Sequence, residues 1–183
     1  MLEDRKIFKR LKKGDRDALC IVYEKYRDSL RTIAGSMLHD TGGAEDVLHD
    51  VFVAFAQKAR QLKIKGSLRS YLATCVANRV RDEYRRKQAR TVQLDHVEPV
   101  SSVSDGPDNR IMADEGTQAL VRALASIPFE QREVVLLHLK GALTFREIAR
   151  IQKTTTSTTH GRYRYGLQKL RTLLDGEFTH ESR

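Results

Sequence analysis

The chain has 183 residues, of which 40% are hydrophobic and 31% are charged, so it suits one domain or two small ones. It has 33 Lys and Arg against 24 Asp and Glu, and the resulting net charge of +9 favours a polyanionic partner, most often nucleic acid. No apolar run approaches the roughly eighteen residues of a membrane span, and charges stand where a signal peptide would have its apolar core. We therefore expect a cytoplasmic protein with no membrane span.

The two cysteines, Cys20 and Cys75, lie far apart, and neither belongs to a CxxC motif. Both fall on apolar faces of expected helices. We therefore predict that they are reduced core residues of a cytosolic protein.

Apolar residues recur at spacings of three and four along the first half of the chain, which is the pattern of amphipathic helices. Gly14 is expected to end the first helix, Asp15 to cap the second and Ser67 to cap the fourth. The residues from Asp40 to Gly43 are expected to break the chain between the second helix and the third. The expected helices cover about residues 3–13, 16–37, 44–62 and 68–90. This strand-free pattern predicts an all-α fold in which residues 1–90 form an antiparallel helical bundle.

The fourth helix becomes strongly basic near its end, where only Asp82 and Glu83 offset the cations. Such a helix end is often simply solvated, because cations suit the negative end of the helix dipole. Asn78 and Tyr84 favour the alternative, contact with nucleic acid, because an amide reads base edges and an aromatic ring stacks on unpaired bases. The basic residues are Arg79, Arg81, Arg85, Arg86, Lys87 and Arg90.

Residues 91–115 differ in composition, with two of the chain's three prolines, several serines and mainly acidic charges. This composition indicates a flexible acidic linker. A second helical unit follows over residues 116–183, in which Pro128 is well placed in the first turn of a helix that stops at Gly141.

A helix-turn-helix pattern follows in this second unit. Thr144 and Glu147 have the spacing of a capping box at the start of a short helix. The hydroxyl-rich residues 153–157 favour a turn, and a longer helix is expected from about Thr156 to Leu174. In this motif the second helix enters the DNA major groove.

The expected second helix of the motif carries no acid before Asp175 and presents polar and basic residues in its first turns. These can reach base edges or phosphates. An ordinary helical hairpin with a solvated basic face is the alternative. The candidate DNA-contacting residues are Thr156, Ser157, Thr159, His160, Arg162 and Arg164.

An acidic cluster at residues 39–50 raises the question of a metal site or an enzyme, because Glu45 and His49 lie one helical turn apart. A metal site in a helical bundle also needs inward-facing ligands from other helices. Val47 and Phe55 take the inward face here, so the cluster is expected to face solvent or a partner. We expect no catalytic residues, no cofactor and no metal.

Two stretches resemble parts of the bacterial sigma factors of RNA polymerase. Residues 44–87, with DVLHDVF at 46–52 and ANRVRDEYRRK at 77–87, resemble the core of region 2. Residues 124–171, which begin LASIPFEQREVVLLHLKG and include the helix-turn-helix, resemble region 4. Because only a linker separates the two, the chain resembles the two-domain extracytoplasmic-function (ECF) class.

The resemblance implies a protein that binds core RNA polymerase and directs promoter recognition, DNA melting and transcription initiation. The partners it implies are the β′ clamp helices and the β flap of the polymerase, promoter DNA and an anti-sigma factor. The segment that docks on the clamp helices matches Asp46, His49, Asp50 and Phe52.

The resemblance also implies two groups of DNA-contacting residues. A loop that captures a base flipped from the −10 element matches Lys63, Lys65 and Ser67, and the helix that holds the melted strand matches Asn78, Arg79, Arg81, Arg85 and Arg86. The helix that contacts the −35 element matches Thr156, Ser157, His160, Arg162, Arg164 and Tyr165.

The chain departs from the family pattern in the helix-turn-helix. The family usually has leucine, glycine and a branched apolar residue where this chain has Gln152, Lys153 and Thr154, and it favours valine at Thr159, a small polar residue at Gly161 and arginine at Tyr165. A glycine inside a helix costs about 1 kcal/mol relative to alanine, and the turn loses a residue that tolerates positive φ. We therefore expect a −35 domain of reduced stability until it binds.

Promoter elements two helical turns apart lie about 70 Å from each other, whereas a flexible tether of 25 residues averages about 27 Å. We therefore expect two loosely tethered modules that read DNA only when the polymerase spaces them. A single fused body, with the arginines after Asn78 covered by the final helices, would contradict this organisation. The alternative is a stand-alone transcription regulator in which residues 1–90 serve for dimerisation or sensing.

Overall fold

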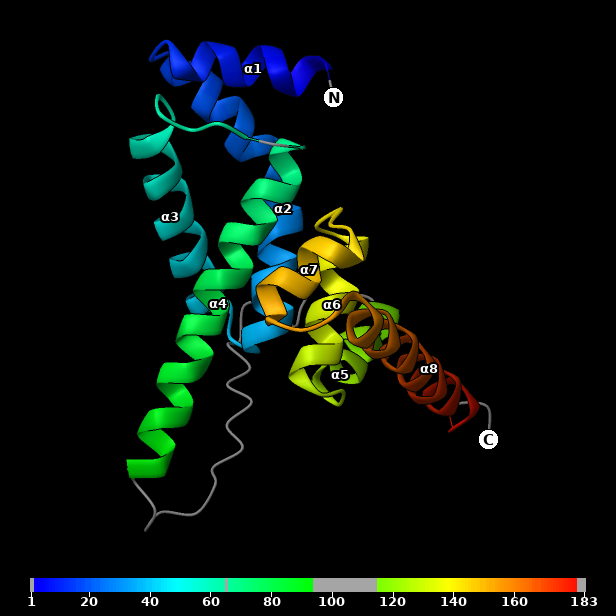
Figure 1. Ribbon diagram of the computed structural model, residues 1–183. Helices are drawn as coiled ribbons and strands as arrows, with labels where there is room; N and C mark the ends of the chain where they lie inside the picture. The colour runs from blue at the N-terminus through cyan, green and yellow to red at the C-terminus, as the bar shows by residue number, and fades with distance from the viewer. Residues whose placement is uncertain (1, 65, 94–114, 181–183) are drawn as a thin grey trace.

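The structure, a computed structural model, describes residues 2–64, 66–93 and 115–180 (Figure 1). Every regular element within these ranges is an α-helix, which confirms the predicted all-α fold. The helices are α1 (Leu2–Lys12), α2 (Arg16–Leu38), α3 (Thr41–Lys58), α4 (Leu68–Gln93), α5 (Glu115–Ala125), α6 (Phe129–Leu139), α7 (Phe145–Gln152) and α8 (Thr156–His180). We call α1–α4 the first domain and α5–α8 the second domain. Most of the expected linker falls outside the described residues.

The first domain is a bundle of α2, α3 and α4, with α1 lying across one end (Figure 1). The carboxylate of Asp15 caps α2 as predicted, because it accepts hydrogen bonds from the backbone N–H groups of Asp17 and Ala18. Each fully buried aliphatic side chain stabilises such a core by about 1.5–3 kcal/mol. The core is formed by Val22, Leu30, Ile33, Leu48, Phe55, Leu72 and Val76, none more than 2% exposed.

The break between α2 and α3 is shorter than we expected. His39 ends α2 in the left-handed conformation, with φ 54°, and α3 begins at Thr41 rather than at Ala44. Asp40 is the N-cap, since its carboxylate accepts from the backbone N–H of Gly43. A side chain at Gly43 would come within 2.8 Å of that carboxylate. The glycine that suggested a loop therefore gives the cap room inside the first turn of a helix.

The second domain contains the predicted helix-turn-helix, α7 and α8. Thr144 and Glu147 form the capping box in both directions, with a Glu147 N–H to Thr144 hydroxyl distance of 3.3 Å and a Thr144 N–H to carboxylate distance of 2.8 Å. Helix α8 starts at Thr156 as predicted but continues to His180, and its C-terminal end extends beyond the other helices (Figure 1). The buried residues that join α6 to α7 include Leu137, Leu143 and Ile148.

The two domains pack against each other, which differs from the loosely tethered arrangement that we expected. Helices α2 and α4 of the first domain contact α5, α6 and α7 of the second. The contacts include an ion pair, a pair of stacked rings and hydrogen bonds to backbone carbonyls of the loop between α6 and α7. The linker composition carries no information about these complementary surfaces, so the sequence could not predict them.

Two glycines of α8 lie in opposite environments, which generates a stability prediction. A Cβ at Gly161 would meet no atom within 4 Å, whereas a Cβ at Gly166 would lie 3.2 Å from Val135 and 3.4 Å from Gln131 on α6. We expect Gly161→Ala to raise the free energy of unfolding by about 0.5–1 kcal/mol through helix propensity. Gly166→Ala should gain nothing or lose stability, because overpacking costs about 1–3 kcal/mol.

Urea unfolding followed by circular dichroism would measure both variants beside the unsubstituted chain. Equal stabilisation by the two alanines would contradict the close packing of α8 on α6.

Candidate nucleic-acid and protein interfaces

An open groove runs between α2 and α3, and acidic side chains stand along it. Asp46 and His49 line it as exposed residues, while Phe52 is 7% exposed and packs edge-on against Tyr23 with ring centroids 4.9 Å apart. Asp50 is also exposed on α3, and its carboxylate accepts a hydrogen bond from Arg79 of α4. The groove is lined by Leu19, Cys20, Tyr23, Glu24, Glu45, Asp46, His49, Phe52, Val53 and Ala56.

The groove also corrects the prediction for the cysteines. Cys20 is exposed and lines the groove, so it is not a core residue, whereas Cys75 is partly buried against the core and has a pKa raised mainly by burial. Both are free thiols. Among the described residues, no group of three or more His, Cys, Asp or Glu side chains could hold a metal ion.

The loop before α4 is described except for Lys65, which lies outside the described residues. Lys63 is exposed. Ser67 caps α4 as predicted, since its hydroxyl accepts from the backbone N–H of Ser70 at 3.0 Å. Among the described loop residues, Lys63 thus presents an exposed cation, and Ser67 has a structural role in addition to the expected contact with DNA.

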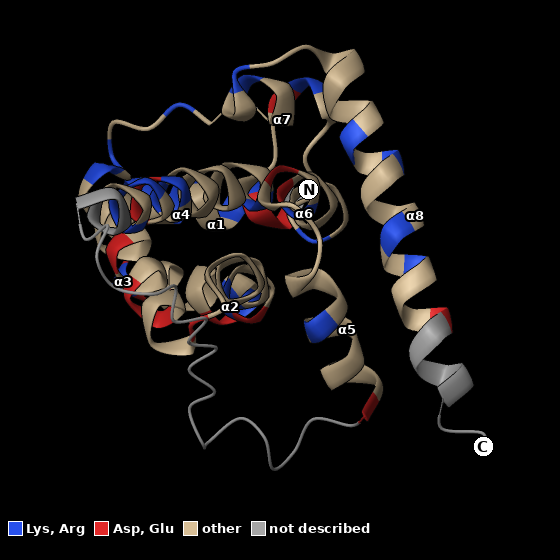
Figure 2. Cartoon of the chain, turned by 90° about the horizontal axis from the view of Figure 1, so that it is seen from below, with Lys and Arg blue, Asp and Glu red and all other residues tan. Residues whose placement is uncertain are grey.

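The basic end of α4 is paired mainly with acids of its own helix. Arg85 lies 3.3 Å from Asp82 and Arg86 lies 3.0 Å from Glu83. Exposed ion pairs of this kind contribute only about 0–1 kcal/mol, so a phosphate can replace the carboxylate at little cost. Figure 2 shows how densely the cations follow α4, and Asn78 is exposed on the same helix.

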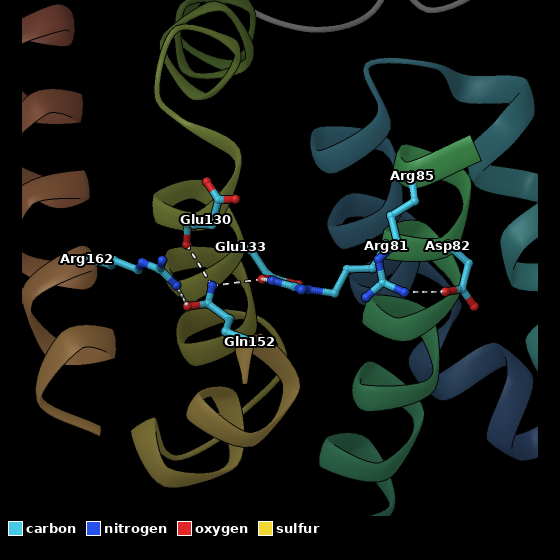
Figure 3. A network of polar contacts seen from close by, with 7 residues as sticks. All are labelled: Arg81, Asp82, Arg85, Glu130, Glu133, Gln152 and Arg162. Carbon is cyan, nitrogen blue, oxygen red and sulfur yellow. Dashed lines mark hydrogen bonds and ion pairs between the residues drawn. The ribbon is translucent and has the colours of Figure 1, made fainter. Parts of the chain in front are cut away.

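Two residues of α4 face the second domain instead of solvent. Arg81 donates from Nε and Nη2 to the two carboxylate oxygens of Glu133, at 2.7 and 2.8 Å, and this bidentate contact raises the pKa of Arg81 (Figure 3). Tyr84 stacks on Phe129, with ring centroids 4.3 Å apart and planes 15° apart. Among the arginines expected to hold DNA, Arg81 is thus covered, while Arg85 and Arg86 are exposed and Arg79 is partly so.

The first turns of α8 display the residues expected to read DNA. Thr156, Ser157 and His160 are exposed, and the rings of His160 and Phe145 form a T-shaped pair with centroids 5.1 Å apart. Further along, Figure 2 shows basic residues at intervals on α8. Arg164 is exposed with its guanidinium 5.2 Å from the ring centroid of Tyr165, which is 55% exposed. Arg162 is half-buried, because it turns back toward Gln152.

Three departures from the family pattern acquire a physical account. The Gln152 amide donates to the Glu133 carboxylate at 2.8 Å and accepts from Arg162 at 2.7 Å, so a position usually held by leucine joins three helices through polar contacts (Figure 3). Thr159 is fully buried, and its hydroxyl donates to the carbonyl of Thr155 at 3.0 Å. Lys153 adopts the left-handed conformation expected of the usual glycine, with φ 52°.

A buried cation at the domain boundary was missed by sequence reasoning. Arg132 is 4% exposed and donates to the carbonyl oxygens of Leu124 and Met37, at 3.2 and 3.3 Å, and to Nε2 of His39. Burial, followed by the nearby Arg132 charge, lowers the pKa of His39 to about 4. Burial likewise lowers the pKa of Arg132. Its position just before the apolar run at residues 134–137 of α6 was a weak signal in the sequence.

A basic bundle helix followed by a basic helix-turn-helix is an arrangement typical of nucleic-acid-binding proteins. The sigma-70 region 2 family model matches residues 22–90, and the sigma-70 region 4 model matches residues 123–172. The chain therefore belongs to the sigma-70 family of RNA polymerase sigma factors, in its two-domain ECF class. The alternative of a stand-alone regulator is not favoured.

The chain is similar to ECF sigma factors along most of its length. It is 25% identical over 172 residues to the ECF RNA polymerase sigma factor SigK of Mycobacterium ulcerans (strain Agy99), with 92% of each chain covered. It is 24% identical over 176 residues to SigW of Bacillus subtilis (strain 168), covering 91% of this chain and 94% of the relative. The sigma factor RpoE of Bartonella quintana, solved with the anti-sigma factor NepR, shares the fold with a TM-score of 0.67 and 22% identity over 84% of this chain and 94% of that one.

The half-buried His39 generates a prediction about pH. The pKa of His39 in the folded protein, about 4, lies below the ordinary value of 6.5, so the folded protein favours the neutral imidazole. The resulting contribution to the free energy of unfolding is complete above pH 6.5 and is lost as pH falls toward 4. Protonation also removes the acceptor at Nε2 and places two cations together. His39 and Arg132 line a pocket that also includes Lys87, and the ion pair of Lys87 with Asp40 at 3.6 Å offsets part of this repulsion.

The substitution His39→Asn keeps a residue that tolerates the left-handed conformation and removes the titration. We expect the urea midpoint of this variant to fall less between pH 7 and pH 4.5 than that of the unsubstituted chain. His49→Asn, at an exposed position of α3, serves as the control. Identical pH profiles for all three proteins would contradict the role of His39.

Proposed function

We propose that this chain is a sigma factor that binds core RNA polymerase, directs it to promoters and assists DNA melting at transcription initiation. The observation that carries the proposal is the match of both sigma regions, in order, within one chain that its ECF relatives cover almost entirely. Run-off transcription with purified core enzyme on a library of genomic fragments tests it. Absence of any specific transcript, together with tight binding of free protein to one intact duplex, would favour a stand-alone regulator.

The contact with the polymerase is proposed to lie at the groove between α2 and α3. Asp46, His49 and Asp50 would supply polar and acidic contacts, and Phe52 would support the surface from beneath. An acidic rim around a partly apolar floor suits a basic helical partner, because charge complementarity guides association and the apolar floor adds burial. We assign this groove to the β′ clamp helices and part of the second domain to the β flap.

Two further surfaces are proposed to contact promoter DNA. Lys63, Lys65 and Ser67 would meet a base flipped from the −10 element, with the melted strand held along α4 by Asn78, Arg79, Arg81, Arg85 and Arg86. The −35 element would be contacted by Thr156, Ser157, His160, Arg162, Arg164 and Tyr165. Phosphate contacts give affinity, whereas base contacts and the cost of flipping a base give specificity.

We propose that the chain has no catalytic activity of its own and that it acts in the cytoplasm, where core polymerase transcribes. Catalysis belongs to the polymerase, and the chain supplies position and specificity. No helix in the described residues is long and apolar enough to cross a membrane. An anti-sigma partner is also proposed, because RpoE of Bartonella quintana was solved with one.

Charge reversal in the groove tests the polymerase contact. We expect Asp46→Arg to weaken binding of the full chain to core RNA polymerase by roughly tenfold or more, since a like charge at an interface costs more than about 1.4 kcal/mol. Asp46 is preferred to Asp50, because replacing Asp50 would also release Arg79.

A titration of labelled protein with core enzyme measures the affinity. Asp28→Arg makes the same charge change at an exposed site of α2 outside the groove and serves as the matched control. If both variants bound core equally well, the groove would not be the contact.

The exposed arginines of α4 generate a prediction about salt. We expect the double variant Arg85→Ala with Arg86→Ala to lower the affinity of the holoenzyme for a transcribed promoter fragment. The slope of log affinity against log salt should become shallower by about 0.7 for each lost contact with a single strand.

Binding measured at several salt concentrations gives the slope. Arg5→Ala with Lys6→Ala, exposed on α1, is the control for the change in net charge. A slope equal to that of the unsubstituted chain would remove these arginines from the DNA interface.

A further inference from the structure

Part of the face of α4 that is expected to hold the melted DNA strand, at Arg81 and Tyr84, is covered by α6 of the second domain. Arg81 keeps only 15% of its side chain exposed, and Glu133, its partner 52 positions later, is fully buried. Figure 3 shows the two side chains extended toward each other across the boundary between the domains. Tyr84, less than one turn further along α4, is covered by the ring of Phe129.

The covering groups have the chemistry of a nucleotide strand. The Glu133 carboxylate accepts two parallel hydrogen bonds from the Arg81 guanidinium, and two oxygens of a phosphate group can accept the same two hydrogen bonds. The Phe129 ring stacks face to face on the Tyr84 ring, and an unpaired base can stack on the same face of a tyrosine. The Arg81 guanidinium also lies 5.9 Å from the Phe129 ring centroid, so the acid and the ring act on one small surface.

We propose that α6 acts as an internal mimic of single-stranded DNA, so that the second domain and the melted strand compete for one surface of α4. The surface consists of Arg81 and Tyr84, and its two alternative occupants are Glu133 with Phe129 and single-stranded DNA. This inference rests on the DNA-binding role proposed above for α4. In the closed chain, Arg81 and Tyr84 are withheld from DNA.

The same contacts reach the recognition helix. Gln152 of α7 joins Glu133 to Arg162 of α8, so the acid that covers Arg81 also holds a residue expected to contact the −35 element. This chain has the bridging amide where the family usually has leucine. Withdrawal of Glu133 from Arg81 therefore changes the surroundings of both DNA-binding surfaces in a single step.

Further contacts hold the closed arrangement in register. Arg69 donates to the carbonyl of Lys140 at 2.8 Å, and the Ser70 hydroxyl donates to the carbonyl of Ala142 at 3.0 Å. Both carbonyls belong to the loop between α6 and α7. These exposed hydrogen bonds can exchange with water, whereas the buried carboxylate needs another cation or solvent when Arg81 leaves. The occupancy of Arg81 therefore controls closure.

The test measures binding of the full chain to a fluorescein-labelled single-stranded DNA of mixed sequence, about 20 nucleotides long. Glu133→Gln keeps the shape of the side chain and removes its charge. We expect this variant to bind the oligonucleotide roughly fivefold more tightly than the unsubstituted chain. Phe129→Leu, which removes the stacked ring by a separate change, should shift affinity in the same direction.

The matched control is Glu130→Gln, which makes the same charge change on the same helix; the Glu130 charge acts on Arg81 through space, but among the described residues its carboxylate forms no ion pair with α4. It should stay within about twofold of the unsubstituted chain, which accounts for the general effect of charge on DNA affinity. Adding Arg81→Gln to Glu133→Gln should abolish the gain. Equal gains for Glu133→Gln and Glu130→Gln, or a gain that survives loss of Arg81, would overturn the proposal.

A distance measurement tests the competition directly. Spin labels at Cys20 and at Lys169→Cys, with Cys75→Ala to leave two labelled sites, report the separation of the domains by electron paramagnetic resonance. Saturating oligonucleotide should move the distance distribution to longer values, and an unchanged distribution would overturn the proposal. Run-off transcription reports separately on the sigma function. If the chain supports transcription but the oligonucleotide does not compete with the second domain, the proposal of an internal DNA mimic is refuted and the proposed sigma function is not.

Discussion

The buried ion pair between Arg81 and Glu133 is the constraint on which the arrangement of the two domains depends. Glu133 is fully buried, and its carboxylate accepts from Arg81 and from the Gln152 amide. A pair of this kind adds little net stability over an apolar contact, but removing one partner leaves an unpaired buried charge at a cost of about 3–5 kcal/mol. The pair therefore selects one register between the domains rather than supplying most of the energy of closure.

Different residues of α4 lie in different environments and have different roles. Its buried side, with Leu72, Val76 and Val80, holds the bundle together. Its exposed cations, Arg85 and Arg86, are balanced only by weak pairs within the helix. Between these two sets, Arg81 and Tyr84 are neither core nor solvated, because the second domain completes their environment. One helix thus supplies a permanent core, a permanently displayed charge and a surface whose partner can change.

The closed chain brings a geometric requirement. Promoter elements two turns apart are separated by about 70 Å, whereas here the domains that would read them are in contact. The polymerase must therefore supply enough binding energy both to separate the domains and to hold them apart. Contact of the polymerase with the groove between α2 and α3, where we propose it, would not compete with the second domain, since the lining of that groove comes from α2 and α3 alone. Under this proposal, binding to core can precede opening.

Local signals predicted most of the fold, because caps and apolar periodicity act over a few residues. Asp15, Ser67 and the Thr144–Glu147 box lie where the sequence placed them. The start of α3 was missed, since Gly43 suggests a loop until the carboxylate beside it is known. The exposure of Cys20 was missed because apolar periodicity does not distinguish the core from an open groove between two helices.

Contacts between distant segments left no comparable signal. Glu133 and Arg132 are consecutive charged residues before an apolar run, and the sequence alone suggests a solvated turn of helix. The structure buries both, one against α4 and the other against the end of α2. A polar residue becomes informative only when its partner is known, and these partners lie in the other domain. The roles assigned to the site residues by resemblance therefore stay predictions.

The departures in the helix-turn-helix are best understood together. Lys153 keeps the left-handed turn at a cost of about 1–2 kcal/mol relative to glycine, and Gly161 gives up helix propensity. Gln152 offsets these costs through hydrogen bonds with the side chains of Glu133 and Arg162, and its amide also donates to the backbone carbonyl of Glu130 at 2.9 Å. The motif is thus weakened by its own sequence at Lys153 and Gly161, and it is stabilised by contacts of Gln152 with α6 and α8 of the same domain.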